Sequence, residues 1–471
     1  MERQRSFSIK PSKLLFLSFT ISSSLLFFFI FSFWFLTPSS SSSSSSYTNT
    51  IHSINGLQTL KAQPFAFSKD VLFDATAQNP ILVTAHLNPT PEIPLNYSLK
   101  NESSVHSSRK EAALIVDKNG EKEVGSTCDV SDGKWVYDSK YPLYTNDSCP
   151  FIDEGFSCEA NGRLDREYLK WRWQPNGCNI PRFNPVKMLE LIRGKRLVFV
   201  GDSINRNQWE SMLCMLRGAI RNPNRVFEAR GRRITKGRGN YNFKFPDYSC
   251  SVEYYVTHFL VHESKARIGH KRSKTLRIDT IDRSSSRWRG ADILVFNTAH
   301  WWSHYKTKAG VNYYQEGDMV HPRLDASTAF RKAMMTWASW VDRHVNSAKT
   351  RVFFRSSSPS HFKGGEWNSG GHCQESTHPL NDTTNRALPE KNKIVEDVVK
   401  QMRTPVTILN ITNLSGLRID GHPSIYGQKA GKGFRSIIQD CSHWCLPGVP
   451  DTWNELLYFH LLSQQKQTLT S

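Results

Sequence analysis

A serine near the middle of the chain lies where it could act as a nucleophile. The apolar run 197–200 leads directly into Gly201-Asp202-Ser203-Ile204-Asn205-Arg206-Asn207, and helix-compatible residues follow as far as Leu216. A glycine at the end of a buried strand permits a sharp turn. A serine at the start of the next helix lies beside unpaired N–H groups and the positive end of the helix dipole, which can stabilise an oxyanion. Asp202 or Ser203 could also be an ordinary helix cap, because both residue types are preferred at that position.

An aspartate and a histidine near the C-terminus could activate this serine. Asp440 and His443 are three residues apart, so in a turn both side chains can reach one point. A serine hydroxyl is a weak nucleophile until a base removes its proton, and the base needs a carboxylate that orients it. An isolated Asp-x-x-His pair is typical of a solvated loop. In an α/β chain with Cys441 and Cys445 on either side of the histidine, we interpret Ser203, Asp440 and His443 as a triad.

Alternating apolar segments predict the elements that would position these residues. Short β-branched runs predict buried strands at 197–200, 293–296, 351–354 and 406–411. Apolar residues at helical spacing predict helices over about 327–345 and 388–402, and we interpret their apolar faces as core rather than as a cofactor site. This alternation predicts an α/β fold with a mainly parallel sheet covered by helices. Functional residues are then expected at the carboxyl ends of the strands.

The N-terminal residues predict a membrane anchor. Residues 14–36 are 23 positions without a charged side chain, and a helix of that length, at about 1.5 Å per residue, covers the roughly 30 Å bilayer core. The stretch is longer than the core of a secretory signal and ends in Phe35-Leu36-Thr37-Pro38, so we expect it to remain uncleaved. Basic residues precede it and no charged residue follows before Lys61. This asymmetry predicts a single-pass type II protein with a cytosolic tail at residues 1–13.

The remainder of the chain divides into a stem and a folded domain. Residues 37–125 begin with an unbroken serine run and continue as polar, turn-rich sequence, which is typical of a disordered stem. The folded domain is expected over residues 126–465. All nine cysteines follow residue 120, and six Asn-x-Ser/Thr sequons occur in the chain. Both features agree with a glycoprotein that folds in an oxidising, lumenal compartment.

The charge of the chain is strongly positive and localised. The net charge is +19, and residues 221–290 hold 17 Lys and Arg against six Asp and Glu. Arg230, Arg232 and Arg233 lie in a glycine-containing part of this region and are candidate substrate contacts. The region is either a solvated face or a surface that attracts an acidic glycan such as galacturonan. Nucleic acid is excluded as a partner by the lumenal topology, and a hydrophobic content of 38% excludes a polytopic membrane protein.

Two sequence blocks resemble a known plant family. GDSINRNQW and DCSHWCLPGVPDTWNELLY resemble the signature blocks of the Trichome Birefringence-like family, over about Cys128 to Leu462. The family domain is similar to GDSL/SGNH esterases, which implies a three-layer α/β/α fold. The resemblance implies O-acetylation of cell-wall polysaccharides of the pectin, xylan or mannan class at the Golgi membrane. The co-substrate would be acetyl-CoA or an acetylated carrier, and we expect neither a bound cofactor nor a metal.

The resemblance also implies roles for single residues. Ser203 would carry the acetyl group, His443 would be the general base, and Asp440 would orient it. The oxyanion hole would use the backbone N–H of Ser203 and the side chain of Asn297, with a glycine that we do not place. Asn297 begins a segment that often reads NTGHWW in the family, and Ala299 is a small departure from it.

The resemblance implies four disulfide bridges. The pairs would be Cys128–Cys178, Cys149–Cys214, Cys158–Cys445 and Cys373–Cys441. Cys250 would remain unpaired, as a small apolar residue. Independently of the family, Trp301 and Trp302 follow Asn297 closely and could offer a flat face to sugar rings, although tryptophan is also ordinary core material.

Three other functions stay open beside acetyl transfer. An esterase of the same architecture would use water in place of the sugar hydroxyl. A non-catalytic protein that binds pectin and maintains its esterification would need the basic region but not the triad. A Golgi glycosyltransferase shares the predicted topology, but the chain contains no Asp-x-Asp sequence, the common nucleotide-sugar signature of that class.

Overall fold

The computed structural model describes residues 128–235, 237, 239–374, 376–381, 388–429 and 439–470, with only the backbone for 466–470. The predicted tail, anchor and stem lie outside these residues. Among the helices that the structure describes, none is long and apolar enough to cross a bilayer.

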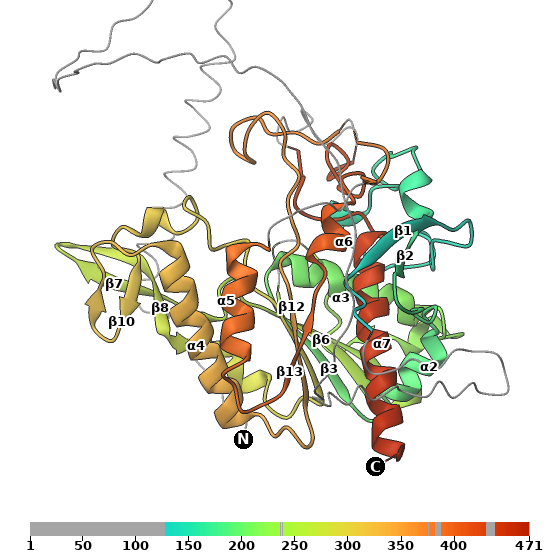
Figure 1. Ribbon diagram of the computed structural model, residues 1–471, viewed down its shortest axis with the longest axis horizontal. Helices are drawn as coiled ribbons and strands as arrows, with labels where there is room; N and C mark the ends of the chain where they lie inside the picture. Colours follow the sequence, from blue (N-terminus) through green and yellow to red (C-terminus); the bar gives the residue numbers. More distant parts are fainter. Residues whose placement is uncertain are drawn as a thin grey trace, which may run out of the picture. The chain divides into compact units, whose positions relative to one another are not determined.

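A seven-stranded sheet forms the centre of the folded domain (Figure 1). Its strand order is β13-β12-β9-β3-β6-β5-β4, and the first five strands are parallel, whereas β5 and β4 are antiparallel to their neighbours. Their bounds are β3 (Arg196–Gly201), β4 (Phe227–Glu228), β5 (Tyr241–Phe245), β6 (Cys250–Val256), β9 (Ile293–Phe296), β12 (Arg351–Arg355) and β13 (Val406–Leu409). The four predicted strands are confirmed, although β13 ends two residues early.

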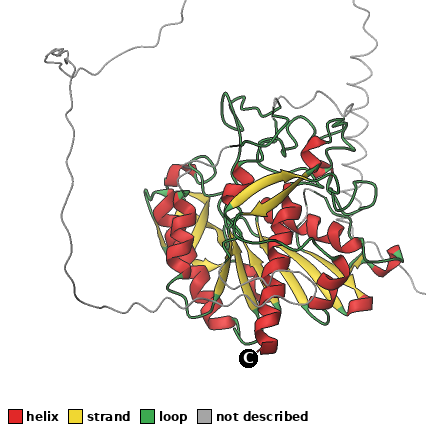
Figure 2. Cartoon of the chain, turned by 45° about the vertical axis from the view of Figure 1, so that its right-hand side comes forward, coloured by secondary structure: helices red, strands yellow, loops and turns green. Residues whose placement is uncertain are grey.

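Helices cover both faces of this sheet (Figures 1 and 2). On one face lie α2 (Pro185–Leu191), α3 (Ser203–Arg217) and α7 (Val449–Thr470), and on the other lie α4 (Ala326–His344) and α5 (Glu390–Val399). Successive residues of a strand point to opposite faces, so Leu197 and Phe199 join the first core and Val198 and Val200 the second. The central strands are therefore apolar throughout, which explains why their runs were recognisable in the sequence.

A second sheet has four strands and was not predicted. It has the order β11-β10-β8-β7 and packs against α4. Its strands are β7 (Val261–Ile268), β8 (Lys271–Ile281), β10 (Tyr314–Glu316) and β11 (Met319–Val320). The prediction of one mainly parallel sheet is thus incomplete, because β7 and β8 form a long antiparallel hairpin within the basic region. Charged residues alternate along β7, and the sequence analysis assigned no element to this part of the basic region.

A small two-stranded sheet completes the fold. The antiparallel strands β1 (Gly133–Tyr137) and β2 (Trp171–Pro175) place Trp135 against Trp173 in a core shared with α6 (Thr412–Gly416) and α7. The Trp135 ring N–H donates to the Leu414 carbonyl at 2.8 Å. Short 3₁₀ turns occupy Glu154–Phe156, Glu167–Leu169, Pro223–Arg225, Pro246–Tyr248, Arg283–Arg287 and Lys308–Gly310.

Four disulfides connect these parts, with the pairing that the family resemblance implies: Cys128–Cys178, Cys149–Cys214, Cys158–Cys445 and Cys373–Cys441. Cys250 is free and buried at the start of β6. Burial raises the pKa of its thiol to about 12, so it remains protonated and packs as an apolar side chain.

Candidate active site

Ser203 lies on a tight strand-to-helix turn at the carboxyl end of β3. Gly201 is the last residue of the strand, and a Cβ there would lie 1.8 Å from Oδ1 of Asn297, so only glycine fits. Asp202 caps α3, because its Oδ1 accepts a hydrogen bond from the Ile204 N–H at 3.0 Å. The interpretation as a cap is therefore correct for Asp202, and the half-buried hydroxyl of Ser203 remains available for other partners.

Ser203, His443 and Asp440 meet in the arrangement expected of a triad. His443 Nε2 is 2.8 Å from Ser203 Oγ, and His443 Nδ1 is 2.8 Å from Asp440 Oδ2. A carboxylate can only accept, so the Nδ1 proton lies toward Asp440 and Nε2 can take the serine proton. Burial alone would raise the pKa of Asp440. The charge of His443 and hydrogen bonds from the ring and backbone of His443 outweigh it and hold that pKa well below its usual range.

The side chain of Asn207, on α3, forms two hydrogen bonds with the backbone of Trp444, the residue after His443. Its Oδ1 accepts from the Trp444 N–H at 2.8 Å and its Nδ2 donates to the Trp444 carbonyl at 3.1 Å. Asn207 is four residues after Ser203, so the two lie on the same face of α3. The disulfides at Cys441 and Cys445 hold the same loop on either side of His443. The position of His443 relative to Ser203 is therefore fixed by covalent and polar contacts.

Arg206 holds a neighbouring segment against the histidine ring. Its guanidinium lies 2.8 Å from Glu210 and 2.9 Å from Asp153, and all three side chains are buried. Asp153 begins the turn that contains Phe156, whose ring lies 5.3 Å from the ring of His443. The motif residues Arg206 and Asn207 thus act through other residues and do not themselves point at the serine hydroxyl.

Two further histidines support the backbone of His443. His422 Nδ1 is 2.6 Å from the His443 carbonyl oxygen, and His361 Nδ1 is 2.7 Å from His422 Nε2. Because a carbonyl only accepts, Nδ1 of His422 must be protonated, and His361 then donates to its Nε2. Burial lowers the pKa of His422 to about 3, with a further contribution from His361. His422 therefore stays neutral and stacks on Trp444 at 4.1 Å.

Asn297, the residue expected to contribute to an oxyanion hole, lies against the turn that carries Ser203. It follows β9, the strand next to β3, and its amide is held by Asp202: Oδ1 accepts from the Asp202 N–H at 3.2 Å, and Nδ2 donates to Asp202 Oδ1 at 2.9 Å. Nδ2 carries a second proton that can be donated. Ser203 is the first residue of α3, where the N–H has no partner within the helix. These two donors are the ones that the family resemblance implies.

Two basic side chains lie near the site: the charge of Asp202 acts on one, and the other contacts the segment that follows Asn297. Arg355 ends β12, is 1% exposed and donates to the Ser356 carbonyl. Burial lowers the pKa of its guanidinium to about 10, which leaves it charged, and the charge of Asp202 acts in the opposite direction. Burial also lowers the pKa of Lys391, whose ammonium donates to the Ala299 carbonyl. Sequence reasoning missed both residues, although Arg355 directly follows a predicted strand, where functional residues were expected.

The predicted substrate residues have different outcomes. Trp302 is 1% exposed and packs on Phe330, so the prediction that it faces a sugar is wrong: its ring belongs to the core beside α4. Trp301 is half-buried. Arg232 forms an ion pair with Glu228 at 2.9 Å and lies over the Tyr241 ring, which gives it a structural role.

Arg230 and Arg233 are exposed on the segment between β4 and β5. This segment leaves the sheet at the same edge as Ser203, because β4 runs parallel to β3.

Comparison with known proteins gives consistent results. Residues 180–460 match the PC-Esterase model, described as a GDSL/SGNH-like acyl-esterase family found in Pmr5 and Cas1p, and residues 126–179 match the PMR5 N terminal domain. Protein trichome birefringence-like 6 of Arabidopsis thaliana is 57% identical over 99% of this chain and 100% of its own. Protein trichome birefringence of the same plant is 50% identical over 72% of this chain and 57% of its own.

Proposed function

The chain belongs to the trichome birefringence-like family and has an acyl-esterase domain, and from this premise we propose that it transfers acetyl groups to a cell-wall polysaccharide through an acetyl-Ser203 intermediate. The observation that carries the proposal is the 2.8 Å contact between His443 Nε2 and Ser203 Oγ, with Asp440 at 2.8 Å behind the ring. A histidine that is oriented by a carboxylate in this way activates a serine hydroxyl for attack on an ester or thioester.

In the first half-reaction, Ser203 Oγ attacks the carbonyl carbon of the acetyl donor while His443 Nε2 takes the hydroxyl proton. The negative charge that forms on the carbonyl oxygen is stabilised by the N–H of Ser203 and the amide of Asn297. When the bond to the leaving group breaks, His443 returns the proton to that group. The donor would be acetyl-CoA or an acetylated carrier.

In the second half-reaction, a sugar hydroxyl takes the place of the leaving group. His443 removes its proton, the sugar oxygen attacks the acetyl carbon, and Ser203 leaves with the proton that His443 returns. Water in the same position would give an esterase. The proposal places the domain in the Golgi lumen behind a type II anchor, where polysaccharide acceptors of the pectin, xylan or mannan class are assembled.

The test is an acetyl-transfer assay with the full-length protein, an acetyl donor and oligosaccharides of each acceptor class, read by mass spectrometry. Ser203→Ala should reduce transfer by about 10⁴-fold or more with an unchanged melting temperature. Ser347→Ala, at an exposed position, is the matched control. Full activity of Ser203→Ala would refute the covalent route. Release of acetate without transfer to any sugar would favour the esterase, and glycan binding without either reaction would favour a binding protein.

A further inference from the structure

The β7–β8 hairpin holds like charges directly opposite each other. Lys265 is the cross-strand partner of Lys274, and Arg267 is the partner of Arg272. The two pairs lie on the same face, because positions two apart on a strand share a face. Like charges in this position destabilise a sheet. Within the residues that the structure describes, none of these four side chains forms an ion pair, so the hairpin presents a strip of four positive charges, and one carboxylate, that of Glu263, lies on the same strand face.

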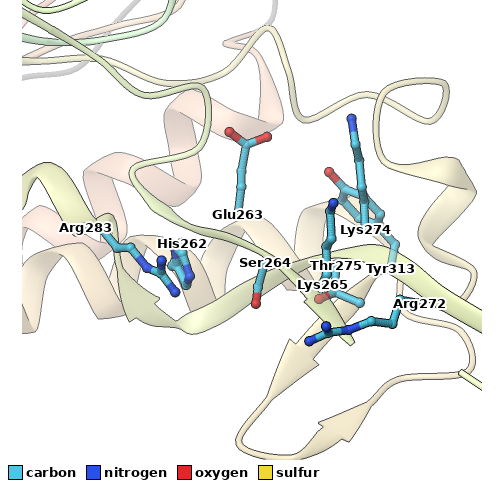
Figure 3. Close-up of a pocket in the computed structure, with 9 residues that line it drawn as sticks. All are labelled: His262, Glu263, Ser264, Lys265, Arg272, Lys274, Thr275, Arg283 and Tyr313. Atoms are coloured by element: carbon cyan, nitrogen blue, oxygen red, sulfur yellow. The ribbon is translucent and has the colours of Figure 1, made fainter. Parts of the chain in front are cut away.

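A cavity of about 470 Å³ opens along this hairpin (Figure 3). Lys265, Arg272, Lys274 and Arg283 line it, together with one carboxylate, that of Glu263. Figure 3 shows Lys274 beside the ring of Tyr313 on one side of the cavity and Arg283 beside His262 on the other. The volume lies within the range of small-ligand sites, roughly 300–1,000 Å³. The cavity therefore suits a ligand that carries more than one negative charge.

Three aromatic rings lie around the ammonium group of Lys306. Lys306 Nζ lies 4.9 Å from the ring centre of Trp301 and 4.1 Å from that of Trp367, and Trp367 contacts Tyr305 at 5.1 Å. We call these four residues the aromatic platform. Tyr305 is 62% exposed, and no ion pair within the described residues neutralises Lys306. Flat rings beside an ammonium suit sugar rings that carry carboxylates.

The chain between Asn297 and Tyr313 connects the turn of Ser203, the platform and the cavity. Trp301 follows Asn297 by four residues, and its ring lies 3.9 Å from that of His258, which contacts Glu263 of the cavity at 3.3 Å. At the other end, Lys308 donates to the Lys274 carbonyl at 3.4 Å and lies over the ring of Tyr313. These contacts link the segment that begins at Asn297 to both the platform and the cavity.

We propose that the aromatic platform and the cavity along β7–β8 bind a uronate-bearing glycan chain, with sugar rings on the platform and carboxylates in the cavity. That this chain is the acetyl acceptor of Ser203 rests on the proposed function. The binding itself does not, and it can be measured without catalysis.

The experiment measures binding of oligogalacturonides to the full-length protein by calorimetry at low salt. Lys265→Gln/Lys274→Gln should weaken binding by about tenfold or more, which corresponds to about 1.4 kcal/mol. The control is Lys349→Gln/Lys400→Gln, which removes the same charge at two exposed positions that precede β12 and β13 of the central sheet, and it should bind as the unchanged protein does. Carboxyl-reduced oligomers of the same length should bind at least about tenfold more weakly to the unchanged protein.

A second measurement excludes loss of fold as the cause. Because Lys265 and Lys274 repel each other, their replacement should leave the melting temperature unchanged or raise it. Trp367→Ala tests the platform separately and should weaken binding of both charged and carboxyl-reduced oligomers, because it removes a stacking face.

Three results would overturn the proposal: equal affinity of the Lys265→Gln/Lys274→Gln variant, equal affinity for carboxyl-reduced oligomers, or tighter binding to anionic lipid vesicles than to the glycan. All the binding measurements are repeated with the Ser203→Ala variant. If that variant binds normally and the unchanged protein transfers no acetyl group, the proposed function fails while the binding site stands.

Discussion

Replacement of Gly201 by alanine should displace Asn297 and so disable the proposed oxyanion hole. The added Cβ would lie 1.8 Å from Asn297 Oδ1, 2.9 Å from its Cγ and 2.8 Å from its backbone oxygen. Carbon and oxygen in ordinary contact are at least about 3.4 Å apart, so the amide must retreat by about 1.6 Å. An oxyanion donor works at about 2.7–3.1 Å. After such a retreat Asn297 no longer reaches the acetyl oxygen.

The loss of one such donor lowers kcat by about 10²–10³, or about 2.7–4 kcal/mol. Gly201→Ala should therefore lower kcat for acetate release from an activated aryl acetate by that factor, with a small change in KM. The shift of the Asn297 backbone should add an unfolding cost of about 1–3 kcal/mol. Circular dichroism and thermal melting check that the variant is folded at the assay temperature.

A double-mutant cycle tests the reasoning. Asn297→Ala should lower kcat by the same 10²–10³, and Gly201→Ala should add little in that background, because the side chain that it displaces is already gone. If Gly201→Ala keeps full activity, or if the two losses multiply, the proposed contact between Gly201 and the oxyanion hole is refuted.

Three further predictions concern the support of the site. Burial raises the pKa of Glu455 to about 7, against an ordinary value of 4.5, so the folded protein holds an extra proton between these values and its stability should fall as the pH rises through them. Glu455→Gln keeps a partner for the Tyr141 hydroxyl and should reduce the fall of the melting temperature between pH 5 and pH 8. A smaller fall should remain, because burial also raises the pKa of Asp451 to about 6 and that of Glu210 to about 8. An unchanged slope would exclude Glu455 as a contributor. Cys373→Ser/Cys441→Ser should lower kcat because it releases the segment beside Asp440, whereas Cys128→Ser/Cys178→Ser should lower only the melting temperature; equal kcat losses would contradict this. His422→Phe should keep the stack on Trp444 but lose the donor to His443, and kcat should fall about tenfold at constant KM; a change confined to KM would count against a positioning role.

The sequence was sufficient for those parts of the fold that one short pattern determines. The central strands are buried on both faces, so runs such as Leu197–Val200 are apolar throughout, and the helix α4 shows its core face at helical spacing. The hairpin β7–β8 shows neither pattern. It is solvated on much of its surface, and its alternating positions carry charged rather than apolar side chains, so the search for apolar runs did not find it.

The candidate site was predictable where chemistry dictates residue type and was not where packing decides. Ser203, Asp440 and His443 could be named because few residue types can form a triad, and their distances agree with that arrangement. The burial of Trp302 could not be separated from the half-exposure of Trp301, because neighbouring tryptophans look alike in a sequence. His422 is brought to His443 only by the folded chain, and no local motif marks it.

Detection of acetyl-Ser203 would test the central claim most directly. The full-length protein is incubated with the acetyl donor alone, quenched in acid and digested, and the peptide that contains Ser203 is examined by tandem mass spectrometry. We expect one added acetyl group on Ser203, lost when an acceptor glycan is supplied and absent from Ser203→Ala. An active enzyme that acetylates its acceptor while Ser203 stays unmodified at every time point would contradict the account.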